Sequence, residues 1–327
     1  MKSVLTMKYP TAGHGEMWRE AAPCGNGMVG ALVYGSVDWE YIMLNHAHLC
    51  DIRIRRVSEN PVYGYRRKID LTKAEVTVRW EEDGAVFTRS TFVSCANNLC
   101  YTRIACTVKG KISIHVGLDI HDPETMYQNT VHNPEIFVND DCVYYASDNN
   151  VAYAPASGSY GAVMRVISHG GTCQADERSI RLSNTDEVVL VTGVFVGAER
   201  KNGFADTLAS VQAGKLYEIA LAEHAVLHQN LYDGVEFSIS DIDTSVEEML
   251  LDAYGSGASN ELMESMYAYG RYLFVCSTGK PVEGAGRSSK QMLLTHLTGL
   301  WNGTYQCFWA IHMFNVNFEM IYWQALS

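Results

Sequence analysis

Short runs rich in Val, Ile, Thr, Phe and Tyr fill the first two thirds of the chain, and turn signals separate many of them. The runs are Val76 to Trp80, Val86 to Val93, Tyr101 to Val108, Ile112 to Ile120, Cys142 to Ala146, Ala162 to Ser168 and Val188 to Val196. Turn sequences such as Glu82-Asp83-Gly84 and Gly170-Gly171 stand between them. Many short strands with such punctuation predict an antiparallel β-sandwich. The sequence shows no alternation of strands and helices and no internal repeat.

The pattern becomes helical near Phe204. Helical spacing is visible at Leu216, Ile219, Glu223, Leu227 and Leu231, and again at Leu262, Met266, Tyr269 and Leu273. Between them, Ser245 to Tyr254 is typical of a helix with Ser245 as N-cap and Glu248 three residues later. We therefore predict an α+β, multidomain chain. It has a β-sandwich domain over 1–203, with a possible last strand near 235–240, a mainly helical linker over 204–258, and further helices over 259–327.

Composition limits the classes of partner and the compartment. The chain has 327 residues, with 25 Lys and Arg against 37 Asp and Glu, a net charge of −12. This acid excess argues against nucleic acid and anionic membranes as partners. Met1 to Trp18 has no apolar signal-peptide core, and no apolar run reaches the roughly 18–20 residues that span a bilayer. We expect a cytoplasmic protein whose nine cysteines are reduced and mostly buried.

Gly25-Asn26-Gly27-Met28-Val29-Gly30 matches the letters of the dinucleotide-binding motif G-x-G-x-x-G. That site requires a strand before the glycines and a helix after them. The segment before Gly25 contains Pro23 and is not a strand by its pattern, and Ala31 to Tyr34 indicates extended chain. A tight turn between strands explains these glycines better than a nicotinamide cofactor does. We predict no cofactor.

Two histidine pairs raise the question of a metal. His46 and His48 would share a face of a strand, and His224 and His228 are four apart on a predicted helix. Neither pair has an evident third ligand, and Ala225 occupies the place of the zinc-protease glutamate. We therefore predict ordinary polar pairs on partly buried faces and no metal site. There is also no nucleophile elbow or P-loop, and nothing supports Cys24 or Cys50 as a nucleophile.

Asn315-Val316-Asn317 places two carboxamides two residues apart, close together if the chain there is extended or irregular. Trp301, Trp309, Tyr322 and Trp323 lie around this motif in sequence, with His312 and Glu319 nearby. Aromatic faces stack on sugar rings, and amides can hydrogen-bond hydroxyls or hold a water molecule. The alternative is an aromatic core segment with capping asparagines, which the spacing alone favours.

Two stretches together resemble glycoside hydrolase family 95, the inverting α-L-fucosidases. The first begins Trp18-Arg19-Glu20-Ala21-Ala22-Pro23-Cys24-Gly25-Asn26-Gly27 and continues through Gly30, Tyr34-Gly35, Glu40 and Leu44-Asn45. The second comprises Tyr269-Gly270-Arg271-Tyr272-Leu273, Gly299-Leu300-Trp301-Asn302 and Asn315 to Trp323. The order and approximate spacing of these motifs agree with the family. The resemblance spans the chain end to end, but the middle is matched by fold pattern only.

The resemblance implies that the sandwich and helical linker lead into the first helices of an (α/α)6 barrel, truncated at Ser327. It also implies that Asn315 and Asn317 hold the attacking water. An amide cannot act as the base unaided, so an Asp assists, and a Glu serves as general acid. The resemblance implies that both carboxyl groups lie in the later barrel, outside this chain. Glu319 is a poor substitute for the acid, because it lies inside the motif rather than across the sugar. Substrate contacts are expected from Asn45, His46, Trp301, His312 and Trp323.

The expected substrate is an oligosaccharide with a terminal 1,2-linked α-L-fucosyl group. Departures from the family pattern at Cys50, Met313 and Ile321 put the sugar in question, and α-L-galactoside specificity is an alternative. A second alternative is a non-enzymatic carbohydrate-binding or relict protein. The sequence leaves the oligomeric state open. An unfinished barrel would expose apolar surface, so we expect self-association of the isolated chain.

Overall fold

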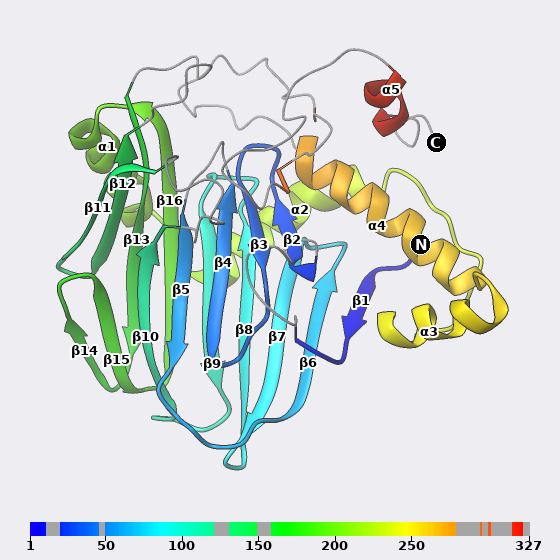
Figure 1. The fold of residues 1–327 in the computed structure, drawn as a ribbon, viewed down its shortest axis with the longest axis horizontal. Helices are drawn as coiled ribbons and strands as arrows, with labels where there is room; N and C mark the ends of the chain where they lie inside the picture. Colours follow the sequence, from blue (N-terminus) through cyan, green and yellow to red (C-terminus); the bar gives the residue numbers. More distant parts are fainter. Residues whose placement is uncertain are drawn as a thin grey trace.

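The computed structural model describes residues 1–10, 20–45, 50–120, 131–148, 158–278, 295, 300–301 and 316–322. Within these residues two antiparallel sheets face each other (Figure 1). One has nine strands in the order β1 (Val4–Met7), β6 (Tyr63–Asp70), β7 (Glu75–Glu82), β8 (Ala85–Val93), β9 (Cys100–Cys106), β16 (Glu187–Ala198), β13 (Ser159–His169), β12 (Cys142–Asp148) and β11 (His132–Asn139). The other has seven strands in the order β14 (Thr172–Ala175), β15 (Ser179–Thr185), β10 (Ile112–Asp119), β5 (Asp51–Arg56), β4 (Trp39–Asn45), β3 (Gly30–Val33) and β2 (Ala22–Gly25).

Alternation of apolar residues along the strands builds the core between the sheets. In β7, Val76, Val78 and Trp80 are buried, while the residues between them are partly exposed. In β10, Ile112 and Ile114 lie in the same hydrophobic cluster from the opposite sheet. A strand directs successive side chains to opposite faces, so this pattern gives each sheet one apolar inner face. The predicted antiparallel sandwich is confirmed.

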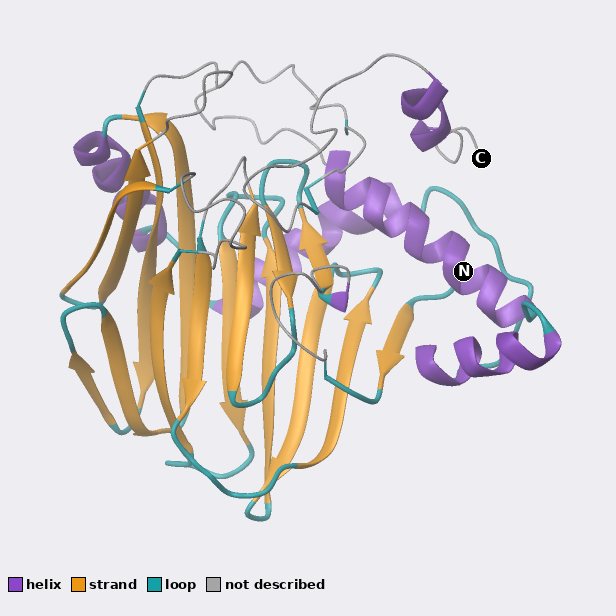
Figure 2. Ribbon diagram, viewed as in Figure 1, coloured by secondary structure: helices purple, strands orange, loops and turns teal. Residues whose placement is uncertain are grey.

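Helices form a third layer and then an extension (Figure 2). They are α1 (Arg200–Gln212), α2 (Tyr217–Tyr232), α3 (Val246–Ser256), α4 (Asn260–Thr278) and α5 (Val316–Tyr322). α1 and α2 cover the outer face of the nine-stranded sheet, where Val211 and Tyr217 join Phe92, Tyr101 and Val191 in a second hydrophobic cluster. The predicted change from strands to helices is confirmed. That the later helices are the first of a truncated (α/α)6 barrel stays a prediction, as do the domain boundaries.

The capping box predicted for α3 is present. Ser245 Oγ accepts a hydrogen bond from the Glu248 backbone N–H at 3.3 Å, and a Glu248 carboxylate oxygen accepts one from the Ser245 N–H at 3.1 Å. The possible strand at Val235–Ile239 is wrong, because these residues form irregular chain between α2 and α3. Its alternating pattern finds no sheet edge to pair with, and β-propensity alone does not make a strand.

The helix predicted around Leu216 to Leu231 exists, but it buries a different face from the one that carried the pattern. Leu216 and Ile219 are 72% and 50% exposed. The buried residues of α2 are Tyr217, Ala220, His224, His228 and Tyr232. Likewise, α4 buries Leu262 and leaves Met266 exposed.

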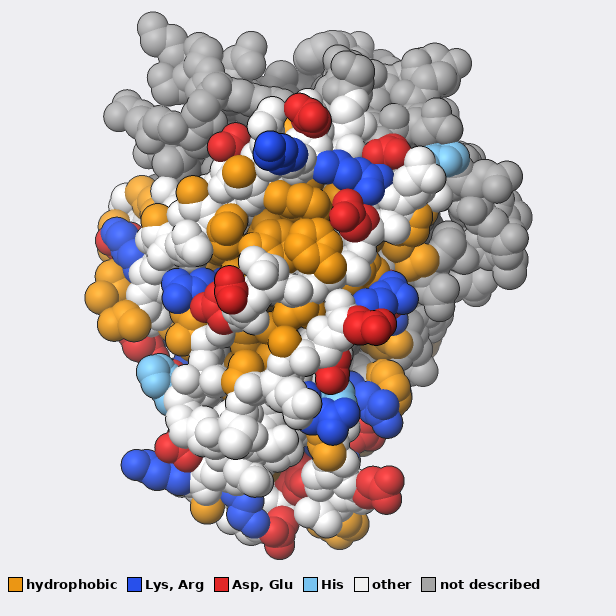
Figure 3. Space-filling model, turned by 90° about the vertical axis from the view of Figure 1, so that its left-hand side faces the viewer, with side chains coloured by type: hydrophobic (Ala, Val, Ile, Leu, Met, Phe, Trp, Pro, Cys, Tyr) orange, Lys and Arg blue, Asp and Glu red, His pale blue; other side chains and the backbone are white. Residues whose placement is uncertain are grey.

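Charge on the surface is mixed. On the side of the molecule where β11, β14 and α1 lie, hydrophobic side chains gather centrally, with acidic and basic side chains interspersed around them (Figure 3). Large apolar side chains are also exposed on α3 and α4: Leu250, Leu251, Tyr254, Met263 and Met266. Self-association through such surface stays a prediction.

Candidate functional site

The structure describes two of the seven predicted site residues in full, Asn45 and Trp301. Asn317 lies in α5, where only its backbone is described. The other four, His46, His312, Asn315 and Trp323, lie outside the described residues.

Asn45 and Trp301 come together at one end of the sandwich. Gly25, Gly30 and Asn45 are successive register partners across β2, β3 and β4, and we call these three residues the strand-end platform. A β-carbon at Gly30 would lie 2.7 Å from Leu300 Cβ, and one at Gly25 would lie 3.1 Å from Trp301 Cη2. Leu300 and Trp301 therefore rest directly on the platform, and only glycine leaves room for them.

Asn45 is a buried amide next to this contact. Its side chain is only 7% exposed, and its Nδ2 has no hydrogen-bond partner among the described residues. A buried amide group without a partner is costly, so Asn45 Nδ2 is suited to donate to a group that enters here.

The turn between β2 and β3 is held by Asn26. Its Nδ2 donates to Ser94 O and to Asn98 Oδ1, both at 2.8 Å. Its Oδ1 accepts from the backbone N–H groups of Met28 at 3.0 Å and Val29 at 2.8 Å. The glycine-rich motif is thus a tight turn between strands, as predicted. The prediction that no strand precedes it is wrong, since Ala22–Gly25 is β2. The strand β3 follows the motif, so no helix N-terminus is available for a pyrophosphate.

The same turn docks the sandwich onto α4. Gly27 N–H donates to Cys276 O at 2.7 Å, and Tyr272 Oη donates to Pro23 O at 2.6 Å. Figure 1 shows the end of α4 beside the upper ends of β2 and β3. Burial raises the pKa of both Cys276 and Tyr272, so these groups stay neutral within the contact. The motif is therefore a joint between the sandwich and the helices.

The helix α5 attaches to the same end of α4. The Tyr322 ring meets the Phe274 ring edge-on at 4.9 Å, and Tyr322 Oη accepts a hydrogen bond from Thr295 N–H at 2.9 Å. The extended or irregular chain that would bring the two amides of the Asn-x-Asn motif together is absent from Val316 onward, where the described residues are helical. Positions two apart on an α-helix are turned by about 200° from each other. The extended backbone that would place positions 317 and 319 on one face is therefore not what α5 provides.

Glu40, which the family resemblance includes, is a structural carboxylate. It is paired with Arg89 in the interior, and its Oε1 accepts from Gly35 N–H at 2.9 Å. Burial raises the pKa of Glu40, and the Arg89 guanidinium opposes that rise. Gly35 has φ +84°, and a β-carbon there would lie 2.7 Å from Tyr65 Oη. This part of the motif fixes the bend between β3 and β4 rather than supplying a catalytic acid.

The histidine pair on α2 also belongs to the core. His224 and His228 are 0% and 1% exposed, so the expectation of partly buried faces was wrong. His224 Nδ1 accepts from Cys95 N–H at 3.2 Å, and His228 Nε2 lies 2.8 Å from Leu71 O. Burial, together with the neighbouring His228, lowers the pKa of His224 to about 3. The described residues contain no cluster of three metal-ligating side chains. His46 and His48 lie outside them.

The described cysteines are free thiols, as expected, and most are buried. Burial raises the pKa of Cys24 and Cys50 well above the ordinary value. A nucleophilic cysteine requires the opposite shift.

Two family models match the chain. The model "Glycosyl hydrolase family 65, N-terminal domain" matches residues 46–197, and "Glycosyl hydrolase family 95 catalytic domain" matches residues 216–327. The first match ends within β16, and the second begins just before α2. The chain is thus a glycosidase-like protein. More particularly, it resembles the N-terminal part of a family 95 glycoside hydrolase.

Individual relatives agree with this. Alpha-L-fucosidase 2 of Arabidopsis thaliana is 21% identical over 98% of this chain and 47% of its own length. Probable alpha-fucosidase A of Aspergillus niger is 22% identical over 84% of this chain and 35% of its own length. The chain therefore spans less than half of these curated relatives.

Among solved structures, a putative kojibiose phosphorylase from the human microbiome is similar in fold. Its TM-score is 0.56 at 10% identity, covering 92% of this chain and 45% of that one. No helix among the described residues is long and apolar enough to cross a membrane.

Proposed function

We propose that the chain is the N-terminal part of an inverting α-L-fucosidase that releases terminal 1,2-linked fucosyl groups from oligosaccharides. The match of residues 216–327 to the family 95 catalytic domain carries this proposal, because it includes the Asn-x-Asn motif. The names of the two curated relatives support the choice of fucose.

In this mechanism Asn315 and Asn317 orient the attacking water. Inversion also needs a base on one face of the sugar and an acid on the other. We propose that these carboxyl groups lie in sequence beyond these 327 residues, so the chain alone would not hydrolyse its substrate. Among the described residues, Glu319 is exposed on α5 and Glu40 is buried with Arg89, so neither is suited to be the acid.

The strand-end platform would form one wall of the substrate site. Trp301 rests on it and offers an aromatic face to a sugar, and Asn45 offers an amide donor. His46, His312 and Trp323 complete the proposed substrate contacts.

The test is to read the coding DNA past the codon for Ser327, express the full frame, and assay it with 2′-fucosyllactose. Proton NMR of the first product should show β-L-fucose, the inverted anomer. N315A and N317A should each lower kcat by about 100-fold through loss of positioning. N139A, an exposed residue of β11, is the matched control and should leave kcat unchanged.

If the first product is α-L-fucose, the configuration is retained and the inverting mechanism is refuted. Faster hydrolysis of an α-L-galactoside would reassign the sugar. Turnover by the 327-residue chain itself would show that the acid lies within it. A frame that ends at Ser327, with sugar binding but no turnover, would favour a carbohydrate-binding protein.

A further inference from the structure

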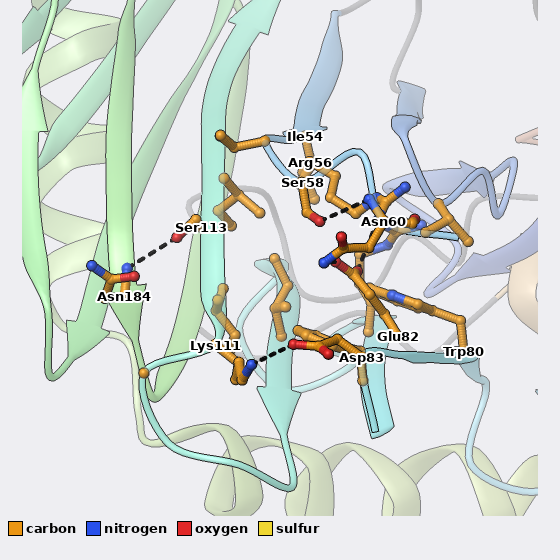
Figure 4. A pocket seen from close by; sticks show the side chains of 18 residues that line it. Ile54, Arg56, Ser58, Asn60, Trp80, Glu82, Asp83, Lys111, Ser113 and Asn184 are labelled. Atoms are coloured by element: carbon orange, nitrogen blue, oxygen red, sulfur yellow. Dashed lines mark hydrogen bonds and ion pairs between the residues drawn. The ribbon is translucent and has the colours of Figure 1, made fainter. Parts of the chain in front are cut away.

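A cavity of about 310 Å³ opens at the end of the sandwich opposite the strand-end platform. It lies between the two sheets, where the β7–β8 turn, the β9–β10 turn and the segment after β5 come together (Figure 4). Ligand pockets begin at about 300 Å³, so this volume suits a molecule of one or two sugar rings.

One wall of the cavity is aromatic and carries an unused donor. Trp80 and Phe87 stack in parallel, with ring centroids 5.3 Å apart and planes 6° apart. Trp80 is only 4% exposed, yet its indole Nε1 has no hydrogen-bond partner among the described residues. Buried indole N–H groups normally find an acceptor, so an acceptor that enters the cavity would satisfy this one.

Arg89 adds a second donor of the same kind. It lines the cavity, its guanidinium carbon is 5.7 Å from the centre of the Trp80 ring, and it is 2% exposed. Its Nη2 is used by Glu40 and by Ser36 O, but its Nε has no partner among the described residues. Both donor nitrogens are closed to water in this structure, so a ligand with oxygen acceptors and an apolar side reaches them when the Trp80 and Arg89 side chains shift on binding.

Every charged side chain in the lining is already paired. Arg56 pairs with Glu82 at 2.8 Å, Lys111 pairs with Asp83 at 2.7 Å, and Arg89 pairs with Glu40. Figure 4 shows Lys111 joined to Asp83 and Asn60 beside Glu82. A charged ligand would have to break one of these pairs, whereas a neutral ligand would leave them intact.

We propose that this cavity binds a neutral carbohydrate of mono- or disaccharide size. After a small shift of the Trp80 and Arg89 side chains, sugar hydroxyls accept hydrogen bonds from their N–H groups and donate to Glu82 and to backbone oxygens. The C–H face of the ring packs on the aromatic wall and on Ile54, Ile104 and Ile114. The site is separate from the proposed catalytic end, so it would hold a second part of a glycan or an independent sugar.

The test follows the Trp80 indole N–H by two-dimensional NMR of the 15N-labelled chain. W80F assigns its signal by difference. Titration with L-fucose, D-galactose, D-glucose and lactose should shift that signal saturably for at least one sugar. D-Glucuronate, the charged comparator, should not shift it. The exposed Trp39, assigned through W39F, is the matched control and should stay unchanged.

Affinity measured by calorimetry gives the second readout. Loss of one hydrogen bond in W80F should weaken binding about fivefold. V37W, which places a large ring at a half-buried position of the lining, should abolish binding, whereas V108W, an exposed position in the nearby β9–β10 turn, should not.

The proposal is overturned if no neutral sugar shifts the Trp80 signal, if only glucuronate does, or if V37W binds as well as the unchanged chain. N317A should leave the Trp80 shift intact. Failure of the proposed fucosidase activity would therefore not affect this result, and a shift confined to Trp301 would report the other end of the sandwich.

Discussion

Replacing Asn26 tests whether the glycine-rich turn is a structural joint. Its side chain is 3% exposed and makes four hydrogen bonds within the turn and to the β8–β9 connection. Each such bond contributes about 1 kcal/mol net, and N26A removes all four. Water can reach the half-buried Met28 N–H and recover part of the loss. We therefore expect N26A to lower the free energy of unfolding by about 3 kcal/mol, a large share of the roughly 5–15 kcal/mol of a typical domain.

The free energies come from urea unfolding followed by circular dichroism. N26D tests the two halves of the network separately. Its carboxylate can still accept hydrogen bonds from the Met28 and Val29 N–H groups, but it replaces the donating Nδ2 by an oxygen that is repelled by Ser94 O and Asn98 Oδ1. We expect it to destabilise at least as much as N26A. N139A, which removes one long 3.4 Å contact on the surface, should change stability by less than about 0.5 kcal/mol. A cost below about 1 kcal/mol for N26A, or a neutral N26D, would refute the argument that Asn26 holds the joint.

Three further changes test other parts of the fold. The pKa of His224 is about 3 in the folded chain and about 6.5 in the unfolded chain. The unfolded state therefore binds the extra proton, and the free energy of unfolding should fall by about 2 kcal/mol as the pH drops from above 6.5 to 5. H224Q should make the free energy of unfolding depend less on pH between 7 and 5. G30A should push Leu300 off the platform, cost about 1–3 kcal/mol and shift Trp301 fluorescence to the red, whereas G255A, with open space around it, should not destabilise. S245A should cost about 1 kcal/mol in thermal unfolding by removing the α3 cap, and no change would contradict that role.

Local patterns were sufficient to predict strands and caps. The run Val76 to Trp80 appears within β7, and Ser245 caps α3, because alternation and capping depend on near neighbours. The buried face of α2 was not predictable in this way. Leu216 carries a helical pattern but is exposed, whereas His228 is buried because a backbone oxygen of a distant segment satisfies its ring nitrogen. Hydrophobicity alone does not reveal such partners.

The candidate site shows the same limit. The sequence indicated a turn at Gly25 to Gly30, but not that Gly30 and Asn45 would be cross-strand partners under Leu300. That contact joins segments far apart in the chain and depends on the register of β3 and β4. The two amides of the Asn-x-Asn motif were expected to lie close together in extended or irregular chain, whereas the described part of the motif is helical from Val316.

The placement of Trp301 makes the sandwich part of the proposed site rather than a neighbouring domain. Trp301 rests on Gly25, and the same turn binds the backbone oxygen of Cys276 in α4, onto which α5 packs through Phe274. Strand ends, α4 and the Asn-x-Asn helix are thus linked by contacts at one end of the molecule. A small displacement of reacting groups can cost about 100-fold in rate. If the proposed full-length fucosidase exists, G30A should therefore lower its kcat more than it changes sugar binding at the opposite cavity, because Leu300 and Trp301 rest on the platform and the cavity lies at the other end of the sandwich.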